Sequence, residues 1–405
     1  MIPNDPPYTP SFGISPPVLA GRDEVLAETM AALRAGPRHP RFGSGLMGNR
    51  GVGKTAVLDA IGERARRDLG WPVLHRQVMG DMDLLADISA GLVESLSPWA
   101  KLGRDYRQLE KQLGVGVNLG VVSAQASVRS VPEAHDTAVV FKRLVHEAGV
   151  FARDHGSGLL VTIDEAMSAR TNDLAVLAGV IQTEVNRALL PVSFVLAGLP
   201  TLRQVLVTAS GTFPNRLYMH ELRDLSPGPS RLALLEPAAQ LGVTWQAEAL
   251  DLVVERSGGH PYYVQLFGYH TWVAGRSAPD VLTLAHAQAG VQASEVVVRQ
   301  QFEETWARLR LQEQAVLSAV AALGPGPVTV QAVARALERS AEQLDVARSR
   351  LVYRHGLLSA PRRGLVDLPN RQLADWVRGS HGQDYKSLVA PESQHRALPR
   401  PPPHD

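Results

Sequence analysis

The chain has 405 residues, of which 45% are hydrophobic and 20% charged, and its formal net charge is +1 at pH 7. This length and composition predict two or three domains with a hydrophobic core, and the near-zero net charge excludes a general attraction to nucleic acid or membrane. The absence of cysteine excludes disulfides, thiol catalysis and cysteine-bound zinc. Because the sequence shows neither a run of 18 apolar residues nor a signal-type N-terminus, we expect a cytoplasmic protein without a membrane partner.

Proline is frequent in residues 1–17, which predicts an extended lead-in. Residues 18–227 are expected to form the main domain, which a helix through about Leu33 opens. A predicted strand at 42–47 then leads to the sequence GNRGVGKT at 48–55, which fits the phosphate-loop pattern G-x-x-x-x-G-K-[ST]. A helical pattern over 54–69 follows, so the loop has the strand–loop–helix context that a nucleotide site needs.

The residue types of this loop suit a phosphate ligand. Glycines permit the φ > 0 turns that aim successive N–H groups at an anion, and the helix that follows adds its positive dipole end. Lys54 supplies a charge for the β- and γ-phosphates, and Thr55 supplies a hydroxyl for Mg²⁺. An accidental glycine-rich turn is the alternative. The predicted nucleotide-binding residues here are Gly48, Asn49, Arg50, Gly51, Val52, Gly53, Lys54, Thr55 and Ala56.

A second motif, GLLVTIDE at 158–165, is a continuous apolar run that ends in two carboxylates. Such a run is typical of a strand buried in a parallel sheet. After a phosphate loop, Asp164 is expected to hold the hydration shell of Mg²⁺, and Glu165 to take a proton from the attacking water. The sequence therefore predicts an α/β core that binds and hydrolyses ATP.

The other elements of the main domain follow from hydrophobic periodicity. They are strands at 73–78 and 192–197 and helices at 82–97, 134–154 and 173–189. Residues 101–132 interrupt this order with an alternating pattern that suggests an inserted hairpin. The insert is either a surface elaboration or a contact for a partner or DNA.

Residues 228–306 are predicted to form a helical lid and a connector, with helices at 229–240, 246–256 and 261–275. Gly258-Gly259 closes one of these helices and Pro261 begins the next. In residues 307–380, three helices precede a hairpin at 357–368, which is the order of a winged helix. The polar residues 381–405 are expected to be a disordered tail.

The basic charge is concentrated in the predicted winged helix. Residues 306–380 hold eleven arginines against six acidic residues. Arg348 and Arg350 fall on the predicted recognition helix, and Arg362 and Arg363 fall at the tip of the hairpin, where DNA phosphates or a minor groove could be reached. Winged helices also serve as protein-contact modules, so double-stranded DNA and a protein partner both stay open.

With the two nucleotide motifs, the Gly-Gly-His-Pro junction and the winged helix in one order, the chain resembles the AAA+ and STAND branches of P-loop ATPases. It is most similar to ATP-binding proteins of the origin-recognition and Cdc6-like type. The resemblance implies an α/β parallel-sheet P-loop core with a helical lid and a C-terminal winged helix, ATP and Mg²⁺ as cofactors, and apolar residues near Arg22 beside the adenine. It also implies the following site residues: Gly48, Gly53, Lys54 and Thr55 for phosphate, Thr55 and Asp164 for the metal, Glu165 for water activation, and Pro261 for the nucleotide.

The resemblance further implies an arginine that reaches the γ-phosphate of a neighbouring copy in a homo-oligomer. Arg216 is the candidate for this catalytic role, and Arg223 is the weaker one. Relatives place a polar residue where this chain has Gly198, and some carry an arginine or histidine sensor at the place of His260. The departure at Gly198 leaves the sensor roles unassigned and favours slow, switch-type hydrolysis.

Three functions are therefore expected to compete. The first is an ATP-driven switch that acts on DNA through its winged helix. The second is a STAND-type regulator, in which the winged helix packs internally or binds protein. The third is a nucleotide-binding scaffold that barely hydrolyses. The arginines of 348–363 distinguish the first two, because an exposed, contiguous face favours DNA and acid-paired arginines favour protein.

Overall fold

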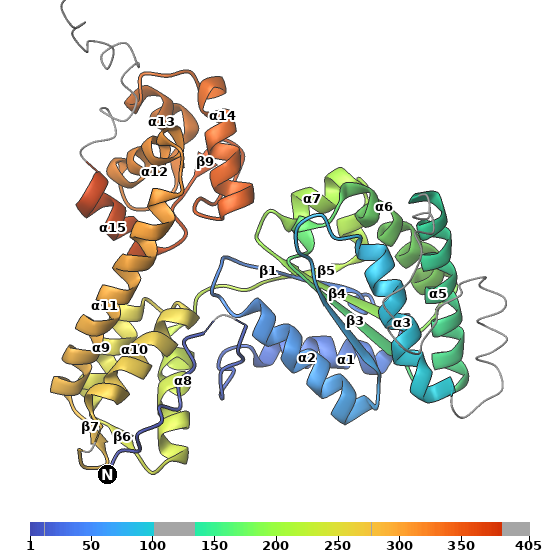
Figure 1. Cartoon of the computed structure of the whole chain (residues 1–405), viewed down its shortest axis with the longest axis horizontal. Coiled ribbons are helices and arrows are strands. Elements are labelled where there is room, and N and C mark those ends of the chain that lie inside the picture. Colours follow the sequence, from blue (N-terminus) through green and yellow to red (C-terminus); the bar gives the residue numbers. More distant parts are fainter. Residues whose placement is uncertain (12, 101–133, 277, 383–405) are drawn as a thin grey trace, which may run out of the picture. The chain divides into compact units, whose positions relative to one another are not determined.

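The computed structural model describes residues 1–11, 13–100, 134–276 and 278–382 (Figure 1). The predicted insert at 101–132 and the tail beyond residue 382 lie outside the described residues. The chain divides into two compact units, which are Met1–Leu284 and Ala285–Asp405. The predicted main domain and helical lid both fall in the first unit. In the part of the chain that the structure describes, no helix is long and apolar enough to cross a membrane.

A five-stranded parallel sheet forms the centre of the first unit, in the order β2-β3-β4-β1-β5. Its strands are β1 (Ser44–Met47), β2 (Val73–Gln77), β3 (Leu159–Asp164), β4 (Val192–Gly198) and β5 (Tyr218–Glu221). Every residue of β3 and β4 is buried, as expected for apolar strands covered on both faces. The predicted α/β class and four of the strands are confirmed, whereas β5 was not predicted.

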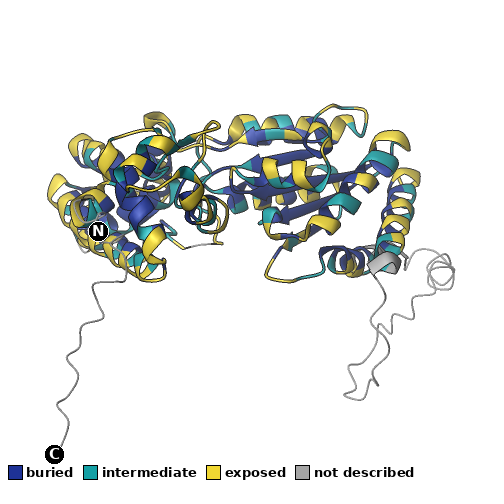
Figure 2. Ribbon diagram, turned by 90° about the horizontal axis from the view of Figure 1, so that it is seen from above, coloured by how far each residue is buried: buried dark blue, intermediate teal, exposed yellow. Residues whose placement is uncertain are grey.

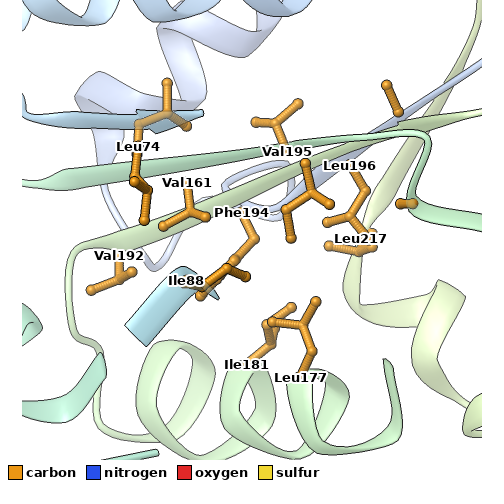
Figure 3. Close-up of a cluster of buried hydrophobic side chains, with 14 of the residues drawn as sticks. Leu74, Ile88, Val161, Leu177, Ile181, Val192, Phe194, Val195, Leu196 and Leu217 are labelled. Atoms are coloured by element: carbon orange, nitrogen blue, oxygen red, sulfur yellow. The ribbon is translucent and has the colours of Figure 1, made fainter. Parts of the chain in front are cut away.

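Within the described residues of the first unit, six α-helices accompany this sheet along the chain. They are α1 (Asp23–Ala35), α2 (Lys54–Leu69), α3 (Leu84–Ala100), α5 (Ala134–Asp154), α6 (Thr171–Val180) and α7 (Leu202–Ala209). Helix α6 continues as the π-helical segment η2 (Ile181–Arg187). Figure 3 shows Leu177 and Ile181 of this helix facing Phe194 and Val195 of β4 across the core. In Figure 2 the central strands are dark blue and the outer helix surfaces yellow, so burial follows this layering.

The helical lid consists of α8 (Pro227–Gln240), α9 (Ala247–Ser257) and α10 (Pro261–Ala274), with a short parallel pair of β6 (Thr244–Trp245) and β7 (Val281–Leu282). The described residues of the lead-in, 1–11 and 13–17, form no helix or strand, and they pack on the lid. The hydroxyl of the buried Tyr8 donates to the carbonyl of Leu234 at 2.7 Å, and the Trp272 Nε1 donates to the carbonyl of Pro3 at 2.7 Å. The lead-in is therefore part of the first unit.

The second unit has its own core and consists mainly of helices. These are α11, which begins at the last residue of the first unit (Leu284–Ala307), α12 (Leu311–Leu323), α13 (Val330–Ala336), α14 (Ala341–Ser349) with its continuation η4 (Arg350–His355), and α15 (Arg371–His381). Ser340 caps α14, since its hydroxyl accepts the Gln343 N–H. The hairpin predicted at 357–368 is reduced to one bridge, Ser359 to Asp367. Strand β9 (Leu365–Val366) lies between these two residues in the chain and pairs antiparallel with β8 (Val328–Thr329).

Candidate functional site

A cavity of about 410 Å³ lies in the first unit, at the carboxyl ends of β1 and β3 and beside the lid. Its lining comes from the lead-in and the start of the main domain, the phosphate loop, the ends of β2 and β3, Leu225, Ala233 of α8, and the beginning of α10. Among the predicted site residues, the lining includes Arg50, Gly51, Val52, Gly53, Lys54, Thr55, Ala56, Asp164, Glu165 and Pro261. Gly48, Asn49 and Arg216 do not line it.

The glycines of the phosphate loop are required by its backbone. Gly51 has φ +77° and Gly53 has φ +89°, which are left-handed conformations that side chains other than glycine rarely adopt. Gly48 has an ordinary φ, but a Cβ there would lie 2.6 Å from the carbonyl oxygen of Leu222. The loop thus packs closely against the segment after β5 and turns into α2 at Gly53.

Lys54 is the first residue of α2 and is only 6% exposed. Its ammonium donates to two carbonyl oxygens of its own loop, those of Gly48 at 3.0 Å and Asn49 at 2.9 Å. Burial lowers the pKa of Lys54, and the carboxylates of Glu165 and Asp164 oppose this shift. The side chain is therefore a buried cation beside the loop, and a bound phosphate would neutralise it.

Thr55 and Asp164 meet across neighbouring elements, although 108 residues separate them in the chain. The Thr55 hydroxyl donates to one carboxylate oxygen of Asp164 at 2.5 Å, and the other oxygen accepts the Glu165 N–H at 2.8 Å. Asp164 is 2% exposed. One hydroxyl and one carboxylate at the edge of a cavity are a donor set that suits Mg²⁺, which keeps several waters and takes its other oxygens from phosphates.

The backbone of Glu165 is strained. Its φ of +51° lies in the left-handed region, which costs a residue with a Cβ about 1–2 kcal/mol. Glu165 is the N-cap of a single 3₁₀ turn, η1 (Ala166–Ser168), and it lines the cavity together with Asp164. Strain of this kind collects at functional positions, and here it accompanies a carboxylate at the cavity wall.

Arg22 also lines the cavity and supports the phosphate loop through a hydrogen bond that was not predicted from the sequence. The residue is 7% exposed, and its guanidinium donates to the carbonyls of Val52 at 3.0 Å and Arg223 at 2.7 Å. The Gly21-Arg22 pair was visible in the sequence, but only the apolar neighbours of Arg22 were assigned a role. Of these neighbours, Val18, Leu19 and Ala20 line the cavity.

Arg216 is held by its own subunit. Its guanidinium donates to Gln182 at 2.9 Å, to the carbonyl of Ala178 at 3.3 Å and to the Thr212 hydroxyl at 3.0 Å. A role at a neighbouring copy would require these bonds to break. Arg223 is exposed and pairs with Glu221 at 2.7 Å. Gly198 ends β4, and a Cβ there would lie 3.0 Å from the sulfur of Met167 and 3.2 Å from the Leu202 Cβ, so a side chain at this position would require its neighbours to shift.

The arginines of the second unit that were predicted to contact DNA differ in their surroundings. Arg348 pairs with Asp345, and Arg350 Nε lies 2.9 Å from a carboxylate oxygen of Glu313, which is 1% exposed. Arg362 and Arg363 lie in the segment before β9 and are exposed. Arg348 and Arg350 are therefore acid-paired, whereas Arg362 and Arg363 are exposed to solvent.

Known proteins with a similar fold were found by comparison of structure. A family described as a domain of unknown function (DUF8462) matches residues 299–377, and no curated protein is similar to the chain in sequence. The Walker-type ATPase of Pyrococcus abyssi is similar in structure at a TM-score of 0.55 and 15% identity, over 89% of this chain and 96% of that chain. The Aeropyrum pernix ORC2 protein, solved with ADPNP and ADP, is similar at a TM-score of 0.53 and 16% identity, over 94% of this chain and 96% of that chain.

These likenesses cover nearly the whole of both solved chains and most of this one. At 15–16% identity they show the fold alone, which this chain shares with these two proteins. The resemblance expected from the sequence is confirmed at this level.

Proposed function

We propose that the chain binds Mg–ATP in the cavity of the first unit and hydrolyses it slowly, as a nucleotide-dependent switch. One observation carries the proposal: Lys54, Thr55, Asp164 and Glu165, which come from two separate motifs, line a single cavity beside a glycine-built loop. A volume of about 410 Å³ lies within the range of small-molecule sites.

The arrangement of the lining suggests how ATP is bound. The N–H groups of the phosphate loop and the N-terminus of α2 receive the phosphates, and the Lys54 ammonium exchanges its carbonyl partners for phosphate oxygens. The base lies toward Val18, Leu19 and Tyr262, which give the cavity its apolar wall. The lid residue Pro261 closes the same end, so a bound nucleotide touches both the sheet domain and the lid.

The Thr55 hydroxyl and the Asp164 carboxylate are the groups that would hold Mg²⁺, directly or through water. When bound, the ion neutralises charge that develops on the transferring phosphate. Glu165 orients a water for in-line attack and accepts its proton. Gly198 gives the end of β4 no polar side chain to help position that water, which is why we propose slow turnover.

For the partner of the switch, we propose double-stranded DNA, contacted through the second unit as a winged helix. Support comes from the exposed pair Arg362 and Arg363, in the loop that joins the Ser359 bridge to β9. Two adjacent arginines in such a loop suit phosphates or a minor groove.

A second function, a STAND-type regulator whose winged helix contacts protein, is favoured by a different observation. Arg350 is turned toward the buried Glu313, and Arg348 toward Asp345, so the helix predicted to read DNA is largely neutralised by its own unit. In this alternative the loop arginines are surface charges with no nucleic-acid role.

Steady-state ATP hydrolysis, measured with and without duplex DNA at two salt concentrations, tests the proposal and separates the two partners. DNA contact predicts stimulation that fades with salt, since phosphate contacts release counterions. In the double variant Arg362→Ser/Arg363→Ser, the slope of log DNA affinity against log salt concentration should become shallower by about one per arginine. The matched control, Arg299→Ser/Arg335→Ser, removes two exposed arginines that lie on helices α11 and α13 instead of in this loop. A turnover rate that DNA does not change favours the STAND-type regulator. The absence of any ATP turnover contradicts the proposed ATPase activity.

A further inference from the structure

The junction between α9 and α10 reaches across to the phosphate loop. His260, the N-cap residue of α10, is 6% exposed, and its ring Nε2 lies 3.0 Å from the carbonyl oxygen of Arg50. The ring also packs on the loop itself, because a Cβ at Gly51 would lie 2.4 Å from the His260 Cε1. A lid side chain thus touches the back of the loop at two successive residues.

The chemistry of this contact assigns the proton. A carbonyl oxygen only accepts, so Nε2 of His260 is the donor, and the ring Nδ1 is left buried without a hydrogen-bond partner. Burial lowers the pKa of His260, and the nearby Asp224 carboxylate opposes this shift. The contact is therefore one neutral hydrogen bond with a defined direction.

The backbone of the junction is built to bring the ring this close. The Leu225 N–H donates to the carbonyl of Gly259 at 2.8 Å, and a Cβ at Gly259 would lie 2.1 Å from the Leu225 carbonyl oxygen. Gly259 also has φ +76°, so glycine is required here twice over. The ring of Tyr263, one turn later in α10, lies 4.6 Å from the His260 ring and fixes its orientation.

Two side chains therefore bind backbone carbonyls of the phosphate loop, and they come from different parts of the first unit. Arg22, at the start of the main domain, donates to the carbonyl of Val52, while His260, from the lid, donates to the carbonyl of Arg50. The Arg22 contact lies within the main domain, whereas the His260 contact joins the main domain to the lid.

We propose that His260 is a positioning residue that couples the helical lid to the phosphate loop, so that the docked lid favours the loop geometry that binds phosphates. The inference rests on the proposed ATP site and assigns a regulatory role to a side chain behind it. In this role His260 acts through the Arg50 carbonyl and does not touch the nucleotide. Phosphate binding in turn favours the docked lid, since coupling between two sites is reciprocal.

The test compares three substitutions in the full chain. His260→Gln can place an amide N–H near the position of Nε2. His260→Asn places it near Nδ1, the nitrogen without a partner, and His260→Met fills similar space without a donor. Each variant is titrated with ATP and with adenosine, and its unfolding is measured. Adenosine is the control ligand because it lacks phosphates.

We expect the Met and Asn variants to lose about 3- to 10-fold in ATP affinity, the factor that one neutral hydrogen bond supplies, with adenosine affinity unchanged. The Gln variant should recover ATP affinity to within about threefold. Equal losses for ATP and adenosine, or a Gln variant as weak as Met, would overturn the coupling role. Wild-type protein that binds adenosine but not ATP would instead overturn the proposed function. If Met prevents folding, the contrast of Gln with Asn still decides.

Discussion

The substitution Gly51→Ala tests the packing of the phosphate loop against the lid in the ligand-free protein. Two penalties meet at this position. The backbone has φ +77°, and the new Cβ would lie 2.4 Å from a ring atom of the buried His260. A matched control exists in the same loop, because Gly53 has φ +89° but no atom within 4 Å of the Cβ position.

The two penalties have different magnitudes. A left-handed backbone costs alanine about 1–2 kcal/mol, and the stiffer unfolded chain returns about 0.4–1 kcal/mol, so Gly53→Ala should lower the free energy of unfolding by about 1 kcal/mol. At Gly51 the ring must move as well. Overpacking of this kind costs about 1–3 kcal/mol, and the hydrogen bond to Arg50 is lost in addition. Together with the backbone penalty of about 1 kcal/mol, we therefore expect Gly51→Ala to cost about 2.5–5.5 kcal/mol.

The assay is urea unfolding of the ligand-free chain, followed by hydrogen exchange of amides in β1 and β4, which report the first unit separately from the second. The informative quantity is the difference between the two variants, since both carry the same kind of backbone strain. A difference of at least about 1 kcal/mol is expected. Equal destabilisation would show that His260 does not pack on Gly51 in solution.

Three further results are expected. Glu165→Gln should keep ATP affinity within about threefold and slow steady-state turnover by about 10²-fold or more, because it removes the base; unchanged turnover would assign the water to another group. Asp164→Asn should weaken ATP binding when Mg²⁺ is present and leave Mg²⁺-free binding nearly unchanged, as calorimetry can show; equal losses would remove Asp164 from the metal site. Unfolded histidine binds a proton near pH 6.5, whereas the pKa of His260 is lowered by burial, so stability is lost as pH falls below 6.5. His260→Gln should reduce the pH slope of the unfolding free energy by at most about 1.4 kcal/mol per pH unit, and an unchanged slope would show that His260 does not contribute to it.

Local pattern was enough to predict the elements that carry the nucleotide motifs. Helix α2 has the predicted bounds because Gly53 and Gly70, both left-handed, close its two ends. Strand β3 was visible because both faces are covered, which makes the whole run apolar. Strand β5 was missed because it has four residues and lies at the edge of the sheet, where only His220 is buried.

The contacts behind the phosphate loop could not be predicted in the same way. Arg22 and His260 each bond to the loop from a distant part of the chain, and no spacing or periodicity records which carbonyl a side chain will meet. The same limit explains Arg350. Its place on the predicted recognition helix was read from local pattern, but its pairing with Glu313 depends on how α12 packs against the end of α14.

The measurement that tests the central claim most directly is calorimetric titration of the full chain with ATP and Mg²⁺, in parallel with Lys54→Ala and with Arg67→Ala. Arg67 lies on the same helix as Lys54 but is exposed and pairs with Asp68. We predict one ATP per chain for the wild type and for Arg67→Ala, and no measurable binding for Lys54→Ala, since the substitution removes the buried cation of the site. Undiminished ATP affinity in Lys54→Ala, or no binding by the wild type, would contradict the assignment of this cavity as an ATP site.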